Sequence, residues 1–249
     1  MSLVPSMVFL KFEKVKKSFG KKEVLSEVSF DVKEKEIFGL IGVSGGGKTT
    51  LLKILVGMSR ATGGKIWFEE KDVLEKPFYL RKNTGFATQK NMLFEELTLA
   101  ENSSYFGKLY GVKRGNLKQR FVNLVELLGL GGFEDLQIRY FSGGMVKRAN
   151  LLVALIHSPK LLILDEPTIG LDPILRENLW GYIHVINQEG TTILVTSHLL
   201  DEIEQNCSRV GILKSGKVVT LATIKEYKSK YGNKPFSKIF QEVMSHGSL

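Results

Sequence analysis

The most informative segment of this chain of 249 residues is Gly42-Val43-Ser44-Gly45-Gly46-Gly47-Lys48-Thr49. It fits the pattern G-x-x-x-x-G-K-[ST] at every fixed position, after the apolar run Ile37–Ile41 and before a helical pattern over Thr49–Met58. The glycines let the backbone wrap around phosphates, and the helix N-terminus adds positive potential. Lys48 is expected to reach the β- and γ-phosphates, and the Thr49 hydroxyl to bind Mg²⁺. The sequence predicts a nucleotide phosphate site; the alternative is a glycine-rich turn without a ligand.

A pair of carboxylates follows a second apolar run, Leu161–Leu164. A buried strand would deliver Asp165 to its C-terminal end, where α/β sheets place ligands. Asp165 is predicted to hold Mg²⁺ directly or through water, and Glu166 to deprotonate the attacking water. The alternative is a strand that ends at a charged surface. A GTPase is unfavoured because the only Asn-Lys pair, Asn233-Lys234, is followed by Pro-Phe and lacks the guanine-reading Asp.

The pattern around these motifs predicts strands that alternate with helices, and therefore an α/β fold with a mostly parallel sheet. Strands are expected over Phe9–Val15, Val28–Val32, Ile193–Val195 and Val210–Leu213, and helices over Leu175–Gln188, Leu199–Asn206 and Phe236–Met244. The segment Lys65–Phe86 is expected to be strand-rich and irregular, and 91–155 to be mainly helical.

The composition narrows the function classes. With 43% hydrophobic and 24% charged residues, the chain is not of the disordered or fibrous type. The single Cys207 excludes an internal disulfide framework. No apolar run approaches the roughly 18 residues of a membrane span. A net charge of +9 favours anionic partners, among them nucleotides, nucleic acid and the inner membrane surface.

A second glycine motif, Phe141-Ser142-Gly143-Gly144-Met145, precedes another helical pattern over Val146–Ile156. Ser142 is a good N-cap residue, and alone the motif indicates no more than a capped helix. Beside a phosphate loop, Ser142 and the two glycine amides predict a second anion site at a helix N-terminus. Two half-sites for one triphosphate suggest a closed head-to-tail dimer, with the loop of one subunit facing the serine-glycine helix of the other.

From Phe9 to about Met244 the sequence resembles the ATP-binding subunit of ABC transporters. Gly42–Thr49 resembles its Walker A loop, Phe141–Met145 its signature and Leu161–Glu166 its Walker B strand. The resemblance implies four catalytic residues, namely Lys48, Gln89, Glu166 and His198, and Mg²⁺ ligands at Thr49, Gln89 and Asp165. It implies ATP contacts at Phe19, Gly42, Val43, Ser44, Gly45, Gly46, Gly47, Lys48, Thr49, Thr50, Ser142, Gly143, Gly144 and Asp172. Phe19 would stack on the adenine base; the alternative is a core aromatic.

Three departures from the commonest family pattern stand out. Phe141 and Met145 occupy the usual Leu and Gln positions of the signature, and Lys35 stands where a turn glycine is usual. Val43-Ser44 replaces the Pro-Asn pair that is common in the drug-resistance and two-component exporter subgroup. The signature, the Gly-Leu-Asp-Pro run that ends at Pro173 and the C-terminal tail are similar to that subgroup.

The resemblance implies a P-loop NTPase (RecA-like) core with an N-terminal antiparallel β subdomain and a helical subdomain. The expected domain spans 7–222, with helices inserted at about 90–158 and a partly helical extension at 223–249. The implied function is ATP hydrolysis that drives a separate membrane-spanning subunit, through ATP-dependent dimerisation, at the cytoplasmic side of the membrane. Export is favoured over import, and no nucleic-acid partner is expected. A soluble ATPase of DNA repair or translation and a non-hydrolysing scaffold are the alternatives.

The segment Gln89–Thr98 is expected to help form the groove for the membrane partner. Met92, Leu93 and Phe94 would supply its apolar surface. Ordinary core residues are the alternative.

Overall fold

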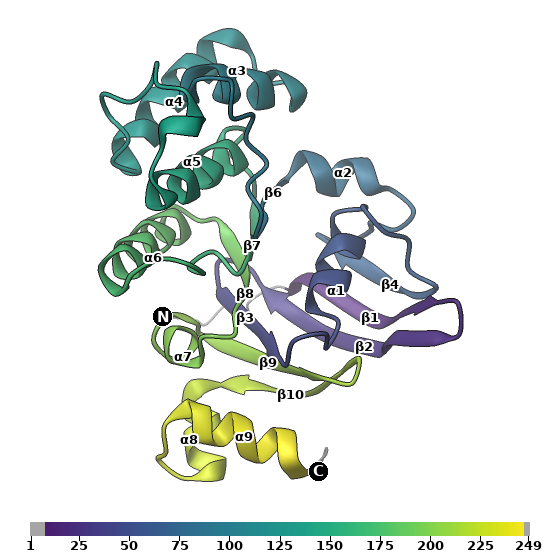
Figure 1. Ribbon diagram of the computed structural model, residues 1–249. Helices are drawn as coiled ribbons and strands as arrows, with labels where there is room; N and C mark the ends of the chain where they lie inside the picture. Colours follow the sequence, from purple (N-terminus) through teal and green to yellow (C-terminus); the bar gives the residue numbers. More distant parts are fainter. Residues whose placement is uncertain (1–7, 247–249) are drawn as a thin grey trace, which may run out of the picture. The chain divides into compact units, whose positions relative to one another are not determined.

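The computed structural model describes residues 8–246, which fall into two compact units (Figure 1). Unit 1 combines the chain up to Arg81 with the chain from Thr192 onward, and unit 2 is Lys82–Thr191. The predicted start at residue 7 and end at residue 249 lie outside the described residues. The helices predicted at about 90–158 fall within unit 2, and their proposed limits as a subdomain remain a prediction.

Unit 1 contains an antiparallel sheet of four strands in the order β2-β1-β4-β5. The strands are β1 (Val8–Phe19), β2 (Lys22–Lys33), β4 (Gly63–Phe68) and β5 (Lys71–Asp72). The Phe12 and Phe30 rings stack at 4.3 Å between centroids, and Leu10 and Val28 are also fully or almost fully buried on these strands. Apolar residues therefore hold the predicted antiparallel β subdomain together.

A second set of strands in unit 1 carries the phosphate loop. Strand β3 (Ile37–Gly42) pairs in parallel with both β8 (Thr192–Thr196) and β9 (Arg209–Lys214), and β10 (Lys217–Thr223) pairs antiparallel with β9. All residues of β3 and β8 are buried, which explains their continuous apolar sequences. Helix α1 (Lys48–Leu55) follows β3, and α7 (Leu200–Asn206) follows β8.

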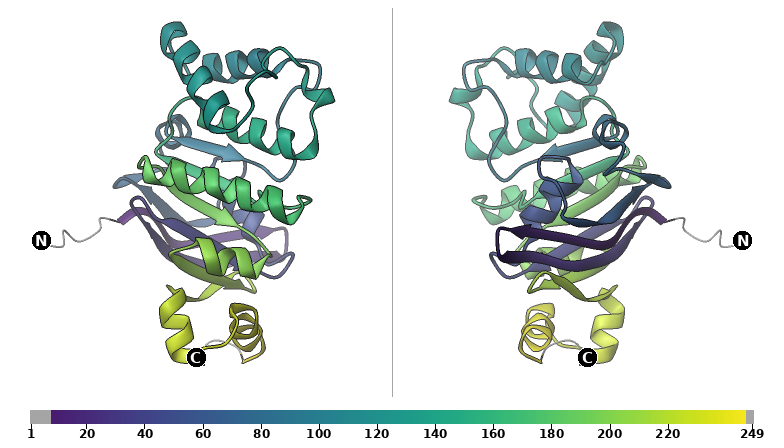
Figure 2. Two further views of the ribbon diagram at one scale, coloured as in Figure 1. Left: turned by 90° about the vertical axis from the view of Figure 1, so that its left-hand side faces the viewer. Right: turned by 90° about the vertical axis from the view of Figure 1, so that its right-hand side faces the viewer.

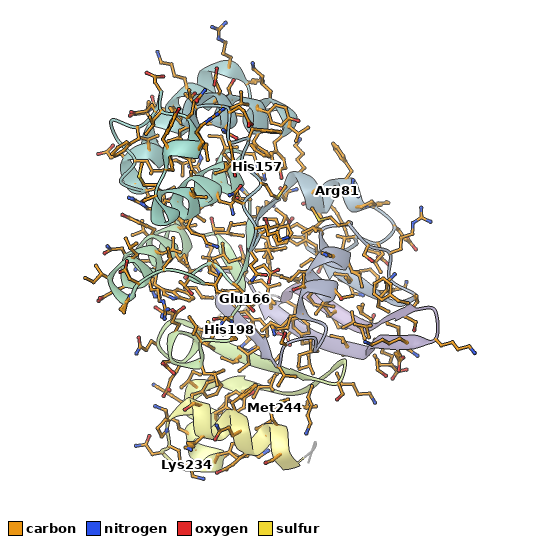
Figure 3. All side chains as sticks on the ribbon, in the orientation of Figure 1. Arg81, His157, Glu166, His198, Lys234 and Met244 are labelled. Atoms are coloured by element: carbon orange, nitrogen blue, oxygen red, sulfur yellow. The ribbon has the colours of Figure 1, made fainter. Side chains whose placement is uncertain are left out.

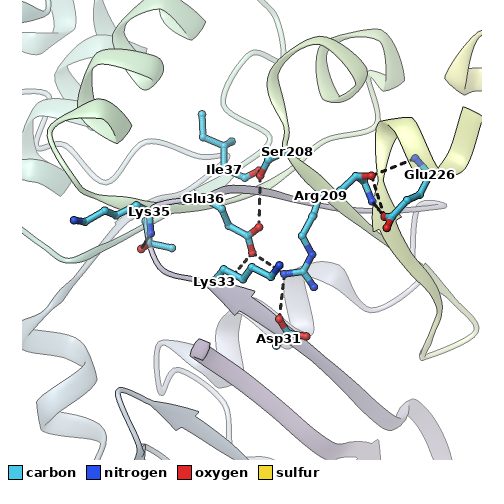
Figure 4. A network of polar contacts seen from close by, with 10 residues as sticks. Asp31, Lys33, Lys35, Glu36, Ile37, Ser208, Arg209 and Glu226 are labelled. Atoms are coloured by element: carbon cyan, nitrogen blue, oxygen red, sulfur yellow. Dashed lines mark hydrogen bonds and ion pairs between the residues drawn. The ribbon is translucent and has the colours of Figure 1, made fainter. Parts of the chain in front are cut away.

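The turn from β2 into β3 accommodates Lys35 at the position where a glycine is usual. Lys35 adopts a left-handed conformation with φ of 59°, the conformation that a glycine would supply. The next residue, Glu36, is buried and accepts hydrogen bonds from the Lys33 amide at 2.6 Å and from Arg209 at 3.1 Å (Figure 4). Arg209 also pairs with Asp31 at 3.1 Å. Burial raises the pKa of Glu36, and the Lys33 amide and Arg209 oppose this rise. The network ties β2, β3 and β9 together.

The C-terminal extension consists of α8 (Ile224–Tyr231) and α9 (Phe236–His246), which lie side by side (Figure 2). Glu204 on α7 pairs with Lys228 at 2.6 Å and accepts a hydrogen bond from the Phe236 amide at 3.0 Å. The Tyr227 hydroxyl donates to the Val210 carbonyl at 3.1 Å, and burial raises the pKa of Tyr227 to about 12. These contacts fix both helices against α7 and β9.

Unit 2 contains the parallel pair β6 (Thr84–Ala87) and β7 (Leu161–Asp165) and four α-helices. The helices are α3 (Leu99–Leu109), α4 (Arg114–Leu127), α5 (Gly143–Leu155) and α6 (Pro173–Gln188), with a 3-10 turn at Ile138–Tyr140. A Cβ atom on Gly85 of β6 would lie 2.1 Å from the Ala154 carbonyl oxygen, so only glycine allows α5 this close to the strand. The predicted fold class, α/β with a mostly parallel sheet, is confirmed.

One local prediction needs correction, and the predicted helix of the tail has a second helix before it. The segment predicted to be strand-rich up to Phe86 also contains α2 (Pro77–Lys82), which opens with proline, a residue suited to a first helical turn. The tail contains α8 in addition to the predicted helix near Phe236. The sequence pattern did not predict helix α8 because Tyr227 is its only buried residue, so the helix has almost no apolar face.

Candidate nucleotide-binding site

The phosphate loop joins β3 to α1, and the packing around it requires two of its glycines, Gly42 and Gly47. A Cβ on Gly42 would lie 2.3 Å from the Leu213 carbonyl oxygen, and one on Gly47 would lie 2.7 Å from a Leu25 methyl group. Gly47 has a φ of 105° and caps α1 without a side chain. The crest of the loop, Val43–Gly45, is exposed. Its backbone is therefore presented to solvent just before a helix N-terminus, as an anion site requires.

Lys48 folds back onto this loop. It is only 7% exposed, and its ammonium donates to the carbonyl of Gly42 at 2.7 Å and lies 3.3 Å from that of Val43. The side chain is thus held inside the loop, where its positive charge would attract a bound phosphate. Thr49 is exposed and Thr50 half-buried in the first turn of α1, where hydroxyls suit a hard cation or a phosphate.

Two further predicted residues lie in unit 1. Phe19 is 55% exposed at the end of β1, which excludes the core alternative and leaves an aromatic face for a base. His198 follows β8 and is exposed (Figure 3). The preceding Ser197 is buried, and its hydroxyl accepts a hydrogen bond from the Leu199 amide at 2.9 Å. This turn projects the His198 position beyond the end of the strand.

The acidic pair lies in unit 2, at the end of β7. Asp165 is 4% exposed, and Glu166 is half-buried with a left-handed φ of 53°. Glutamate rarely adopts this conformation, and such outliers gather at functional sites. Asp165 is thus the last residue of β7, and Glu166 is the first residue of the loop that follows.

Gln89 is exposed in the loop after β6, and α5 holds the backbone of this loop. The Lys147 ammonium donates to the backbone carbonyl of Gln89 at 3.2 Å, and the side-chain amide of Asn150 donates to the backbone carbonyl of Thr88 at 3.3 Å. Burial lowers the pKa of Lys147, and the Glu166 charge opposes that effect. Sequence reasoning missed Lys147; its position five residues after Ser142, on the helix of the second glycine motif, was the available signal.

The second glycine motif forms the start of α5, as predicted. The Ser142 hydroxyl caps the helix by accepting from the Met145 amide at 3.3 Å. A Cβ on Gly143 would have no neighbour within 4 Å, whereas one on Gly144 would lie 3.0 Å from Leu175. The exposed Gly143 therefore leaves an open position at the start of α5.

Asp172 has a structural role that the sequence reasoning did not assign. Its carboxylate caps α6 by accepting from the Leu175 amide at 3.0 Å, with Pro173 in the first helical position. The preceding Gly170 has a left-handed φ of 80°. A cap explains Asp172 without a ligand, so its contact with ATP stays a prediction.

Met92, Leu93 and Phe94 divide between the two alternatives. Leu93 is buried, as a core residue would be, whereas Met92 and Phe94 are 41% and 42% exposed. Phe94 also contacts the exposed Tyr105 ring edge to face at 4.9 Å between centroids. An apolar surface does exist on this segment.

The predicted residues thus fall into two groups. Unit 1 holds Phe19, the loop 42–49 with Thr50, and His198, while unit 2 holds Gln89, 142–144, Asp165, Glu166 and Asp172. Within residues 8–246 no helix has the length and apolar character that crossing a bilayer requires. The fold and the loop define the class of protein: an α/β nucleotide-binding protein with a P-loop.

Comparison with known proteins narrows this class. The ABC transporter family model matches residues 25–169. A linearmycin resistance ATP-binding protein of Bacillus subtilis is 35% identical over 90% of this chain and 72% of its own length. A lantibiotic transport ATP-binding protein of Streptococcus pyogenes is 36% identical over 84% of this chain and 89% of its own length. The solved structure of an ATP binding subunit of an ABC transporter has a TM-score of 0.86 at 26% identity, covering 94% of this chain and 99% of that one.

The chain therefore belongs to the ABC transporter family. Within it, the chain is of the ATP-binding ATPase type, as its sequence predicted. The similarity to proteins of resistance and lantibiotic transport agrees with the predicted exporter subgroup.

Proposed function

We propose that this chain hydrolyses ATP to drive a separate membrane-spanning export subunit, through ATP-dependent head-to-tail dimerisation. The observation that carries the proposal is the pair of accessible helix N-termini, α1 after Gly47 and α5 after Ser142. Each presents the backbone amides of a first helical turn and the positive end of a helix dipole. One triphosphate between the loop of one subunit and the α5 start of another would satisfy both.

In this proposal each side chain has a separate task. The loop amides and Lys48 bind the phosphates, and His198 contacts the γ-phosphate. Glu166 accepts the proton of the attacking water, so that hydroxide attacks phosphorus while ADP leaves. Ser142 and Gly143 of the opposite subunit stabilise the charge that spreads over the phosphate oxygens.

The proposed metal ligands fit Mg²⁺ by their donor atoms. Thr49 offers a hydroxyl, Asp165 a carboxylate and Gln89 an amide oxygen, all of them hard oxygen donors. The exposure of Thr49 in the first turn of α1 suits a metal that also contacts phosphate. Bound Mg²⁺ would neutralise phosphate charge during transfer.

The exposed apolar surface of unit 2 supports a membrane-subunit partner. Met92, Phe94 and Tyr105 would cost free energy in water unless a partner covered them. Export is favoured because the relatives named above serve resistance and lantibiotic transport. The proposed location is peripheral, at the cytoplasmic side of the membrane.

Light scattering on Glu166→Gln, with and without ATP, tests the proposal. The amide cannot accept the proton, so hydrolysis should fall at least about 100-fold while binding persists. ATP should then convert monomer to dimer. Glu189→Gln, at an exposed glutamate at the end of α6, is the control and should hydrolyse ATP normally. A Glu166→Gln protein that binds ATP and stays monomeric, even with the membrane subunit present, would overturn the dimer mechanism.

A further inference from the structure

The aromatic ring proposed to receive the base already has a cation on one side. The Lys17 ammonium lies over the Phe19 ring, 4.6 Å from its centroid. The ring nevertheless stays 55% exposed, so the ammonium covers only part of it. A cation over an aromatic face is an attractive arrangement, because the face of the ring carries partial negative charge.

A backbone carbonyl outside β1 holds this ammonium in place. Lys17 donates to the carbonyl of Arg60 at 2.7 Å. Arg60 belongs to the segment between α1 and β4, which is itself fixed: the Thr62 amide donates to the Lys16 carbonyl at 2.8 Å. The Met58 amide donates to the Lys53 carbonyl at the end of α1, at 2.7 Å. The lysine is therefore anchored to the segment that follows the phosphate-loop helix.

We propose that Lys17 is a positioning residue of the base site: its anchored ammonium covers one face of Phe19, and the purine base of ATP stacks on the other. The inference rests on the proposed function, because it requires Phe19 to receive the base. The ammonium withdraws electron density from the ring, so the opposite face becomes less negative and stacks better on an electron-rich base. Anchoring also keeps the ring from turning away, which lowers the entropy lost on binding.

A ligand without a base separates this role from phosphate binding. We would titrate the purified chain with Mg²⁺-ATP and with Mg²⁺-tripolyphosphate by calorimetry. Phe19→Ala should lower the affinity for ATP about 10-fold, which is the effect of losing one stacked base. The affinity for tripolyphosphate should stay unchanged. Lys17→Met should weaken ATP about 3-fold, also without changing tripolyphosphate. In the Phe19→Ala background, Lys17→Met should have no effect.

Two variants control for charge and for the cation. Lys21→Met removes the same charge from an exposed position in the β1–β2 turn and should change neither affinity. Lys17→Arg keeps a cation that stacks on aromatic rings and should restore ATP affinity.

Each other outcome overturns a different statement. Equal loss of ATP and tripolyphosphate affinity in Lys17→Met would mean that the charge acts on phosphates, against the inference. Normal ATP affinity in Lys17→Met, with weak ATP binding in Phe19→Ala, would refute the role of Lys17 and leave the base site intact. Normal ATP affinity in Phe19→Ala would refute the base site itself.

Discussion

The two glycine-rich helix starts, one in each unit, are built in different ways. At α1 two glycines are enclosed: Gly42 lies against the Leu213 backbone and Gly47 against Leu25. At α5 the N-cap is a serine side chain, and Gly143 faces open space without a positive φ. The protein's own packing thus requires Gly42 and Gly47. It gives no reason for Gly143, whereas a ligand that approaches the α5 amides would.

Substitution at the enclosed site should have the largest effect on the free energy of unfolding. In Gly42→Ala the new methyl group would meet the Leu213 carbonyl at 2.3 Å, so β3 and β9 would have to separate locally. We expect a loss of about 3 kcal/mol or more, together with loss of ATP binding. Urea denaturation and calorimetry would measure both. Gly181→Ala, at an open position in α6, is the control and should stabilise the protein; a Gly42→Ala protein of normal stability would contradict the packing argument.

Acid should weaken unit 2 through His157. The ring stacks on Tyr110 at 3.7 Å and hydrogen-bonds the Thr84 carbonyl at 3.2 Å. Burial, with a smaller contribution from Arg120, lowers its pKa to about 4. The unfolded chain, with a pKa near 6.5, binds the proton first, so the stabilisation is complete above pH 6.5 and falls as the pH drops towards 4.

The loss over this range should reach about 2–3 kcal/mol. Urea denaturation at a series of pH values would measure it. His157→Phe keeps a ring against Tyr110 and should remove this part of the pH dependence. An unchanged pH profile in that variant would show that other groups are responsible.

Local chemistry explains what the sequence could predict. The loop 42–49 and the Ser142 cap depend on neighbouring residues, and both lie where they were expected. The T-x-x-E signal of α8 was also local: Thr223 and Glu226 form a capping box, but the polar helix around it concealed the signal. The Leu213 carbonyl against Gly42 could not be foreseen, because it depends on pairing strands about 170 residues apart.

The serine cap at α5 should contribute less to stability than the packing around Gly42. Ser142→Ala removes the acceptor of the Met145 amide, which should cost about 1 kcal/mol. Ser142→Asn restores an N-cap acceptor and should recover most of this loss. If capping were the only task of Ser142, the asparagine variant would also recover ATP-dependent dimerisation in a Glu166→Gln background; we expect it not to.

Lys35 in unit 1 is the reverse case, a left-handed position without glycine. Lys35→Gly should stabilise the protein by about 0.5–1 kcal/mol, because glycine adopts a φ of 59° without steric cost. The Lys35 amide donates to the Thr192 hydroxyl at 2.9 Å, and this bond survives the change. Thermal denaturation would measure the gain, and a loss would show that the lysine side chain contributes more than its backbone costs.

Gly143→Ala should change stability least, and it tests the comparison most directly. The added methyl group enters open space in the first helical turn, so we expect a change within about 0.5 kcal/mol. In a Glu166→Gln background Gly143→Ala should nevertheless reduce ATP-dependent dimerisation. The methyl group would lie where the phosphates of ATP bound to the opposite subunit must approach. Gly115→Ala, an open glycine in the first turn of α4, is the matched control and should dimerise normally. If both variants dimerise equally well, the open position at α5 receives no ligand, and the resemblance between the two helix starts is limited to their sequences.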